Sequence, residues 1–526
     1  MSETELLRDT HEHATSLRQG LSRWLTQSSL MDGPYRNQGG EDEANYSLAW
    51  FSHYLISADE AVLSRFGSLL ADLAGWVASD CVHGYEPEAE AHHGTEPFLL
   101  FLPRYLGLVP GDDTARGLLE DAAHHIGNWV EETPAWYDYD RDVFRGYSIG
   151  NRVVDDSPHY QVELTEHLRF VHIALAAHRV LREDRYLEWA LRYGRKRAER
   201  LVAASEPVPL GWDLDGGELH WRDAADRPRF GGMCALSHKV QGDPLGGIEN
   251  HLASGAVMAY GDLFEASGDT IFRDAARRIV TPLVDELADP FGDPAAAALS
   301  HYRVAFGDTT LDEAALRVIE SAPEENDRPW VMLQPEQRKR REPGIGKRSD
   351  MLYWGEFGED GSARPLAEPS TAASALAYQI GGDVRHARRA LRGGARKFEM
   401  ALRILRGGRE HADMGGAICS VAAGHGRNWG AGAVTGCYGS LLLGCHDSRG
   451  EVEPAVRLRD AGGRDRVPED ILPLVRPAVG GQPGELLLFN GSDEEVELDW
   501  RSGDVDTHES LPAGAILRRP LAGSPG

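Results

Sequence analysis

The stretch Gly246-Gly247-Ile248-Glu249-Asn250-His251-Leu252-Ala253-Ser254-Gly255 lies where a long polar segment ends and an apolar helical pattern begins. Its polar and titratable side chains sit directly at this junction. The same arrangement recurs at 92–96 and 157–163, and the segments 300–302 and 425–429 carry similar residues in or near loops. Connecting loops often carry function on a rigid scaffold. The sequence therefore predicts a ring of helix pairs whose chemistry is collected at one rim.

Short turns separate successive helical patterns, because a small residue ends one helix and Asp, Ser or Thr caps the next. These turns are 57–60, 110–113, 182–185, 267–270, 307–309 and 381–384. The helices after the turns are amphipathic: 63–77, 115–130, 186–202 and 384–405. The helices after the long segments are more apolar or richer in small residues: 98–106, 252–263, 371–380 and 433–443. Outer helices alternating with inner ones predict an all-α (α/α) toroid or barrel of roughly six to seven helix pairs.

In such a ring the long segments share one rim and the short turns share the other. The long segments are 30–44, 81–95, 133–160, 206–247, 321–369 and 409–432. They are rich in Trp, Tyr, His, Arg and Asp, and loops of this length inside a domain are usually functional. After residue 450 the pattern changes to short alternating or apolar runs separated by Gly, Asp and Ser. We expect a helical catalytic domain over 1–450 and a small β-sandwich-like domain over 451–526.

Composition narrows the class of protein. A formal net charge of −28 argues against a partner such as nucleic acid or an anionic membrane. The five cysteines show no paired spacing, which indicates a reducing compartment. The polar N-terminal residues do not resemble a secretion signal, and no apolar run approaches the roughly 20 residues of a membrane span. We expect a cytoplasmic protein, and the oligomeric state stays open.

The architecture, an α/α toroid followed by a β module, resembles the polysaccharide lyases of the heparinase II/III and alginate-lyase type. Asn250-His251 at a helix start looks like the Asn-His pair of these enzymes, and Tyr302 falls downstream where their catalytic Tyr is found. The resemblance implies cleavage of uronate-containing glycans by β-elimination. It implies catalytic roles for Asn250, His251 and Tyr302.

Elimination chemistry gives independent roles to the same residue types. The proton at C5 of a uronate becomes acidic only when the adjacent carboxylate is neutralised, which an amide, a cation or a metal can do. A Tyr or His then takes the proton, and a Tyr or His protonates the leaving oxygen. We therefore predict a catalytic set drawn from the long-loop rim: Asn250, His251, Tyr160, His159 and Tyr302.

Further residues of the long loops are candidates for substrate binding. The basic segment 338–348 and Arg427 would hold anionic sugars by charge-assisted contacts. Aromatic rings provide faces on which sugars stack: Trp136, Tyr137, Trp354 and Trp429. Polar side chains of the same loops complete the predicted substrate-binding set: His93, Glu96 and His425.

Two rival functions remain open on the same residues. A glycoside hydrolase of this fold would use a pair of carboxylates from Glu96, Glu163 and Glu249, although Glu in a first helical turn is also ordinary capping chemistry. A non-catalytic glycan-binding ring would use the aromatic loops alone. The sequence leaves all three functions open.

No cofactor is required by any of these reactions. Histidines that could converge on an ion are His83, His92, His93, His159, His251, His301 and His425, and no two show a recognised ligand spacing. If a divalent metal is bound, nitrogen-rich ligands favour Zn or Mn over Ca. Cys437 and Cys445 are expected in the core, and no phosphate loop or dinucleotide motif occurs.

Overall fold

Tight turns alternate with long connections through the helical part of the chain, and this alternation organises the fold. The computed structural model describes residues 1–27, 41–87, 89–90, 96–126, 135–152, 154, 161–220, 246–288, 293–322, 328, 330–333, 353–365, 370–404 and 434–521. Outer helices are α1 (Glu3–Gln27), α3 (Glu60–Asp80), α5 (Asp113–His124), α7 (Asp184–Ala203), α11 (Thr270–Val280) with η6 (Thr281–Glu286), α13 (Asp312–Ser321) and α15 (Val384–Ile404).

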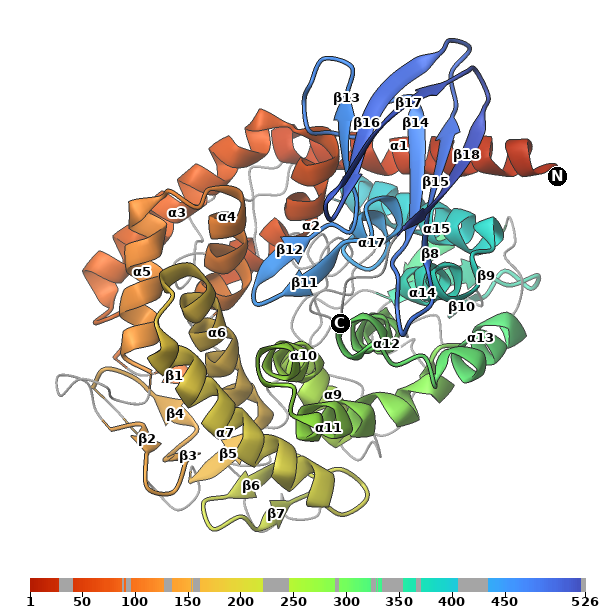
Figure 1. Ribbon diagram of the computed structural model, residues 1–526. Helices are drawn as coiled ribbons and strands as arrows, with labels where there is room; N and C mark the ends of the chain where they lie inside the picture. The colour runs from red at the N-terminus through yellow and green to blue at the C-terminus, as the bar shows by residue number, and fades with distance from the viewer. Residues whose placement is uncertain are drawn as a thin grey trace.

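Inner helices follow the long connections. They are α2 (Glu41–Ser57), the π-helical turn η3 (Pro97–Phe101) continued by α4 (Leu102–Leu108), η4 (Thr165–Leu168) continued by α6 (Arg169–Leu181), α9 (Gly246–Ala253), α10 (Ala256–Ser267), α12 (Asp293–Phe306), α14 (Thr371–Gly381) and α17 (Tyr438–Leu442). They contact one another in chain order, and α17 returns to α2 (Figure 1). The expected mainly helical body followed by β strands is confirmed.

The short turns carry the predicted caps. Side chains of Asp59, Asp112 and Asp269 each accept a hydrogen bond from the first turn of the following outer helix. Two inner helices end in a left-handed glycine, α10 at Gly268 with φ 68° and α14 at Gly382 with φ 72°, a conformation that glycine adopts without strain. We call this end of the ring, at 58–59, 109–112, 182–183, 268–269, 307–311 and 382–383, the short-turn rim. The opposite end, where the inner helices begin, is the long-loop rim.

One inner helix differs from its expected form. The sequence predicts a single helix over 252–263, but the structure has α9 and α10 separated at Ser254 and Gly255. Gly255 adopts φ 67°, a left-handed conformation that ends α9, and its carbonyl accepts the amide hydrogen bond of Ala259 in α10. The break sets α9 apart as a short segment at the long-loop rim.

The first and last outer helices close the ring. The packing of α1 against α15 places the ring centroid of Trp24 5.6 Å from that of Phe398, edge to face, and 4.5 Å from that of Trp50 on α2. A Cβ on Gly20 would lie 2.8 Å from the Phe398 ring, so only glycine lets the two outer helices approach this closely. Residues nearly four hundred positions apart thus form one aromatic contact.

The C-terminal strands form two antiparallel sheets beside α1 (Figure 1). One sheet has the order β14 (Ile471–Arg476), β15 (Gly484–Asn490), β18 (Ile516–Leu521), and the other has β13 (Arg457–Asp460), β16 (Val496–Ser502), β17 (Val505–Leu511). Residues 471–475 of β14 are buried, because this strand packs against α1, α14 and α17.

A hairpin covers the centre of the ring at the short-turn rim. Strands β11 (His446–Ser448) and β12 (Glu451–Glu453) contact α10 and α4 and lie over the ring opening in Figure 1. Arg104 of α4 bonds Asp447 at 2.8 Å and also donates to the carbonyls of Leu99 and Leu100, which the π-helical turn leaves available. These contacts fix the hairpin to the ring at this end.

Short strands decorate the long connections as small antiparallel sheets. They are β1 (Ala89–Glu90) with β4 (Ser148–Ile149), β2 (Tyr137–Asp138) with β3 (Val143–Phe144), β5 (Val162–Leu164) with β6 (Gly211–Asp213) and β7 (Glu218–Leu219), and β8 (Trp330–Leu333) with β9 (Tyr353–Phe357) and β10 (Ala363–Pro365). Within the described part of the chain, α3 alone is as long and apolar as a membrane-spanning helix. Its Phe66, Leu69 and Leu73 pack into the protein core, as expected for an outer helix of the ring.

Replacing Phe398 with Ala tests whether the α1–α15 contact closes the ring. Phe398 is 1% exposed, and loss of a buried phenyl group costs about 3–5 kcal/mol of unfolding free energy. Urea unfolding followed by tryptophan fluorescence should show this loss, whereas Val505→Ala, at a side chain 48% exposed, should shift it by less than about 0.5 kcal/mol. Equal stability of the two variants would contradict the closing role of the contact.

Candidate functional site

The N-terminal ends of the inner helices meet at the long-loop rim. Glu96 precedes η3, Thr165 begins η4, Asn250 lies in α9, and the Ser370 side chain caps α14. Helix N-termini carry partial positive charge and unpaired N–H groups. Several of them facing one opening favour an anionic ligand, provided that side chains complete the site.

Asn250 is the most unusual side chain at this rim. Its exposed fraction is 0%, and its backbone carbonyl accepts a hydrogen bond from the Thr165 hydroxyl at 3.0 Å. Neither the amide nitrogen nor the amide oxygen has a hydrogen-bond partner among the described residues. An amide buried in this way costs about 1–3 kcal/mol. It therefore requires an explanation beyond helix packing.

His251 follows Asn250 but is held as part of the scaffold. Its Nδ1 lies 2.9 Å from the Gly247 carbonyl oxygen, and its ring meets Trp212 edge to face at 6.3 Å. Burial lowers the pKa of His251 to about 4, so the imidazole is neutral at neutral pH. Glycine at position 247 permits this packing of α9, because a Cβ there would lie 2.0 Å from the Val208 carbonyl oxygen.

A second group of buried polar residues lies along α6. Arg169 forms an ion pair with Glu96 through Glu96 Oε1, and the other carboxylate oxygen, Oε2, has no partner within the described residues. One turn further, His172 Nε2 lies 3.3 Å from the Ser254 carbonyl oxygen, which links α6 to the α9–α10 break. Glu96 and Asn250 thus flank the start of α6 from its two neighbours in the ring.

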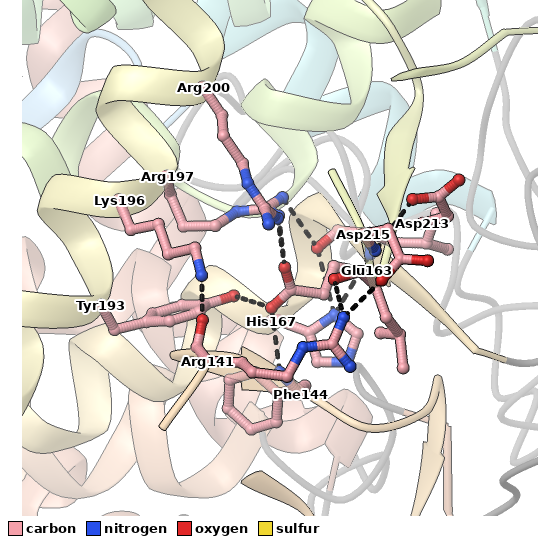
Figure 2. Close-up of polar contacts among 12 residues, drawn as sticks. Arg141, Phe144, Glu163, His167, Tyr193, Lys196, Arg197, Arg200, Asp213 and Asp215 are labelled. Atoms are coloured by element: carbon pink, nitrogen blue, oxygen red, sulfur yellow. Dashed lines mark hydrogen bonds and ion pairs between the residues drawn. The ribbon is translucent and has the colours of Figure 1, made fainter. Parts of the chain in front are cut away.

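Glu163 lies in β5 and pairs with Arg197 and Arg200 of α7 (Figure 2). Its carboxylate bonds Arg200 at 2.7 Å, Arg197 at 3.2 Å and the Phe144 amide nitrogen at 2.9 Å. The carboxylate is fully buried and saturated with donors. It serves as an anchor for α7, so the structure does not bring it together with Glu96 as a catalytic pair.

The anchor also supports His251. The Arg197 guanidinium lies 4.6 Å from the centre of the Trp212 ring, whose edge in turn meets His251. Glu163 fixes Arg197, Arg197 covers Trp212, and Trp212 positions His251. Glu163 and His251, which the sequence analysis assigned to rival reactions, are thus connected through Arg197 and Trp212.

A cavity of about 100 Å³ lies on the ring axis between the inner helices and the β11–β12 hairpin. Ser300 donates to Gln379 at 2.8 Å across its wall. His301 also lines it, and His301 Nε2 is buried without a partner among the described residues. Burial, reinforced by the neighbouring His446, lowers the pKa of His301 to about 4.

Tyr302 points away from this cavity. Its hydroxyl donates to Asp308 at 2.6 Å in the turn between α12 and α13, at the short-turn rim, and burial together with Asp308 raises its pKa. Successive helical residues point about 100° apart, so the segment 300–302 presents His301 to the axis and Tyr302 to the outer layer. The structure therefore does not bring Tyr302 together with Asn250.

Two predicted sugar platforms are core residues. The Trp136 side chain is 0% exposed and donates from Nε1 to the Gly150 carbonyl at 2.8 Å. Tyr137 is 2% exposed and packs edge to face on Trp189 and Tyr193. Because both rings are enclosed by other aromatic residues, neither offers a face on which a sugar could stack.

Several other predicted residues lie outside the described ranges. These are His93, His159, Tyr160, His425, Arg427 and Trp429, together with the basic segment 338–348. Trp354 falls in β9 and Glu249 in α9. The sequence analysis did not single out Thr165 and Arg169. Their local sequence has only the ordinary features of a helix start, which other helices share.

A separate cluster of possible metal ligands lies elsewhere. One donor atom each from His83, Asp121 and His125 lies within 4.8 Å of the others, and this is the one such group in the described part of the chain.

Comparisons with known proteins leave the family unassigned. No family model matches the chain, and no curated protein matches it in sequence. One similar solved structure is a variant of unsaturated glucuronyl hydrolase, an (α/α)6 barrel, with the saccharide dGlcA-Glc-Rha-Glc. It shares 12% sequence identity, the match covers 61% of this chain and 86% of that chain, and the TM-score is 0.39. A similarity of this size identifies neither the family nor the activity of this chain.

The anchoring role of Glu163 predicts a loss of stability in Glu163→Gln. Removing one charge leaves Arg197, which is 1% exposed, buried without its counter-ion, and such a change costs about 3–5 kcal/mol. Chemical denaturation measures the effect. Asp215→Asn is the matched control, since its ion pair with Arg141 is solvent-exposed and contributes at most about 1 kcal/mol. If both variants lost equally little unfolding free energy, Glu163 would not be an anchor for α7.

We expect the buried His301 to contribute to the loss of folding stability at acid pH. Its folded-state pKa of about 4 lies below the unfolded value of 6.5, so between these values the unfolded chain binds the proton and the folded chain does not. Stability therefore falls as the pH is lowered through this window. His301→Leu should flatten the dependence of unfolding free energy on pH by up to about 1.4 kcal/mol per pH unit.

His508 provides a control of opposite sign. It is exposed, and its hydrogen bond to Asp499 raises its pKa, so protonation favours the folded state. His508→Leu should leave the acid loss unchanged or slightly steeper. A flattening in His508→Leu, or its absence in His301→Leu, would show that the acid response arises elsewhere.

Proposed function

We propose that the protein cleaves acidic glycans at a uronate by β-elimination, at the long-loop rim, with Asn250 neutralising the uronate carboxylate. The observation that carries the proposal is the buried Asn250 amide, which has no partner for either polar atom among the described residues. A ligand carboxylate accepts from the amide nitrogen and so removes the cost of burying it.

The proposed reaction is a β-elimination that includes two proton transfers. A base removes the proton at C5 of the uronate, and the resulting negative charge spreads into the carboxylate that Asn250 holds. The bond between C4 and the glycosidic oxygen breaks, its electron pair leaves with that oxygen, and an acid returns a proton to it. The products are a new reducing or free-hydroxyl end and a sugar with a double bond between C4 and C5.

His251 acts in this proposal as a positioning residue. With a pKa of about 4 it is neutral at pH 7 and a weak base, and its one N–H is used in the hydrogen bond to the Gly247 carbonyl. Tyr302 is bonded to Asp308 at the other rim. The base and acid are therefore assigned to the long connections, where Tyr160 and His159 remain the predicted groups.

Substrate access requires movement. Asn250 is 0% exposed, so a glycan reaches it only when a segment that covers the rim is displaced. Closing of loops over bound substrate commonly excludes water from the reacting atoms. The scaffold behind Asn250 does not move in this scheme, because Thr165 and Trp212 hold α9 in place.

A hydrolase is the second candidate, and Glu96 is the observation that favours it. Its carboxylate is 5% exposed, Arg169 holds one oxygen, and the other oxygen is buried without a partner among the described residues. A carboxylate held this way suits a base or nucleophile in glycosidic hydrolysis. The hydrolase would retain the same substrate class and opening.

Replacing Asn250 with Leu separates function from stability. The side chains are similar in size, and an amide without partners adds nothing to stability, so thermal unfolding should occur at the same temperature or higher. Activity should fall by about 100- to 1000-fold, as when one donor to a developing negative charge is removed. The assay is ultraviolet absorbance of the new double bond against a panel of uronate-containing polysaccharides and oligosaccharides.

Outcomes of this assay discriminate between the candidates. New reducing ends without absorbance, abolished in Glu96→Gln, would replace the lyase by the hydrolase. Full lyase activity in Asn250→Leu would remove Asn250 from the mechanism. Tight binding of a uronate glycan without any cleavage would leave a binding ring in which Asn250 recognises the carboxylate and performs no chemistry.

A further inference from the structure

A separate cluster of donor atoms joins the end of α3 to the end of α5, on the outer wall of the ring. His83 lies in the loop that follows α3, and Asp121 and His125 lie at the C-terminal end of α5. The loop is fixed in place, since the Tyr85 hydroxyl donates to the Ala122 carbonyl at 2.8 Å. Gly84 packs closely against Phe98, since a Cβ at position 84 would lie 2.9 Å from the Phe98 ring.

His83 itself adopts φ 57°, a left-handed conformation that residues other than glycine rarely take. This conformation turns the imidazole back toward α5. The two rings of His83 and His125 stack with centroids 3.4 Å apart and planes 8° apart. Two imidazoles are thus brought face to face at one carboxylate by a strained loop residue.

The donor atoms share one side of the cluster. His83 Nδ1 lies 2.9 Å from Asp121 Oδ1, and His125 Nδ1 lies 3.4 Å from the same oxygen. Nitrogen and oxygen ligands of a tetrahedral ion, each about 2.0–2.2 Å from it, are separated from one another by about 3.4 Å. The observed separations are near this value, and rotation of one imidazole out of the stack would place the three donors around one ion.

We propose that His83, Asp121 and His125 bind one divalent transition-metal ion, zinc or a close neighbour such as cobalt or nickel. Two imidazole nitrogens and one carboxylate oxygen are the donor set that such ions prefer over calcium or magnesium. Three protein ligands leave a fourth position for water. On binding, His125 Nδ1 exchanges its present 2.6 Å hydrogen bond to the Asp121 carbonyl for the ion.

The surroundings suit an ion that enters from solvent. The side chains of His83 and Asp121 are 28% and 43% exposed, which leaves an approach from outside, while His125 forms the buried wall. A bound ion would tie the end of α3 to α5 beside the long-loop rim, independent of the glycan site.

The test is a titration of the full chain, freed of metal by a chelator, with Co²⁺ alone. Visible absorption of the bound ion and calorimetry with Zn²⁺ report binding. One equivalent should bind, and His83→Ala, His125→Ala and Asp121→Asn should each weaken binding by at least about tenfold. Asp121→Asn keeps the shape of a half-exposed side chain, so it gives a folded variant even if His125→Ala does not.

His508→Ala is the matched control. His508 Nδ1 contacts Asp499 at 2.8 Å, the same type of pair as His83 with Asp121, but without a second imidazole. Its replacement should leave the bound equivalent and its affinity unchanged. The proposal is overturned if the wild-type chain takes up no stoichiometric ion, or if Asp121→Asn binds with wild-type affinity.

Discussion

A tight turn between two packed helices can only reverse the direction of the chain, and this constraint determines where the protein can do chemistry. Each short turn joins the end of an inner helix to the start of an outer one, and Asp59, Asp112 and Asp269 cap the outer helices at this point. Every inner helix therefore begins at the same rim. The positive ends of these helices are collected at that rim by topology alone, before any side chain is chosen.

The two rims carry different kinds of polar interaction as a result. At the short-turn rim Arg104 bonds Asp447, Arg179 bonds Glu451, and the Arg449 amide bonds Asp262. Arg449 Nε is buried there without a hydrogen-bond partner among the described residues. Burial raises the pKa of Asp262 to about 8, which leaves this carboxyl largely protonated in the closed end of the ring. At the long-loop rim Asn250 and Glu96 keep polar atoms without partners in the described residues.

The sequence was sufficient for the helical periodicity and for the caps, because both depend on residues close together in the chain. It was also sufficient to select 246–255 as a special helix start, since the run of polar residues before an apolar helix is local. Tyr302 and Trp136 show where this reasoning stops. Whether Tyr302 or its neighbour His301 faces the axis depends on the rotation of α12, and whether the Trp136 ring is open depends on Tyr85 and Phe170, which are remote in sequence. The stacked His83 and His125 depend likewise on the packing of two helices.

The contrast between the back and the front of α9 supports a binding role more strongly than either side does alone. Behind it, Glu163, Arg197 and Trp212 form a saturated series of contacts that ends on His251. In front of it, Asn250 is as deeply buried as the residues of the core and yet satisfies neither of its polar atoms within the described chain. A protein that needed only packing at this position would gain by an apolar residue of the same size. A rigid support beneath an unsatisfied amide is the arrangement expected of a site prepared for a ligand that arrives later.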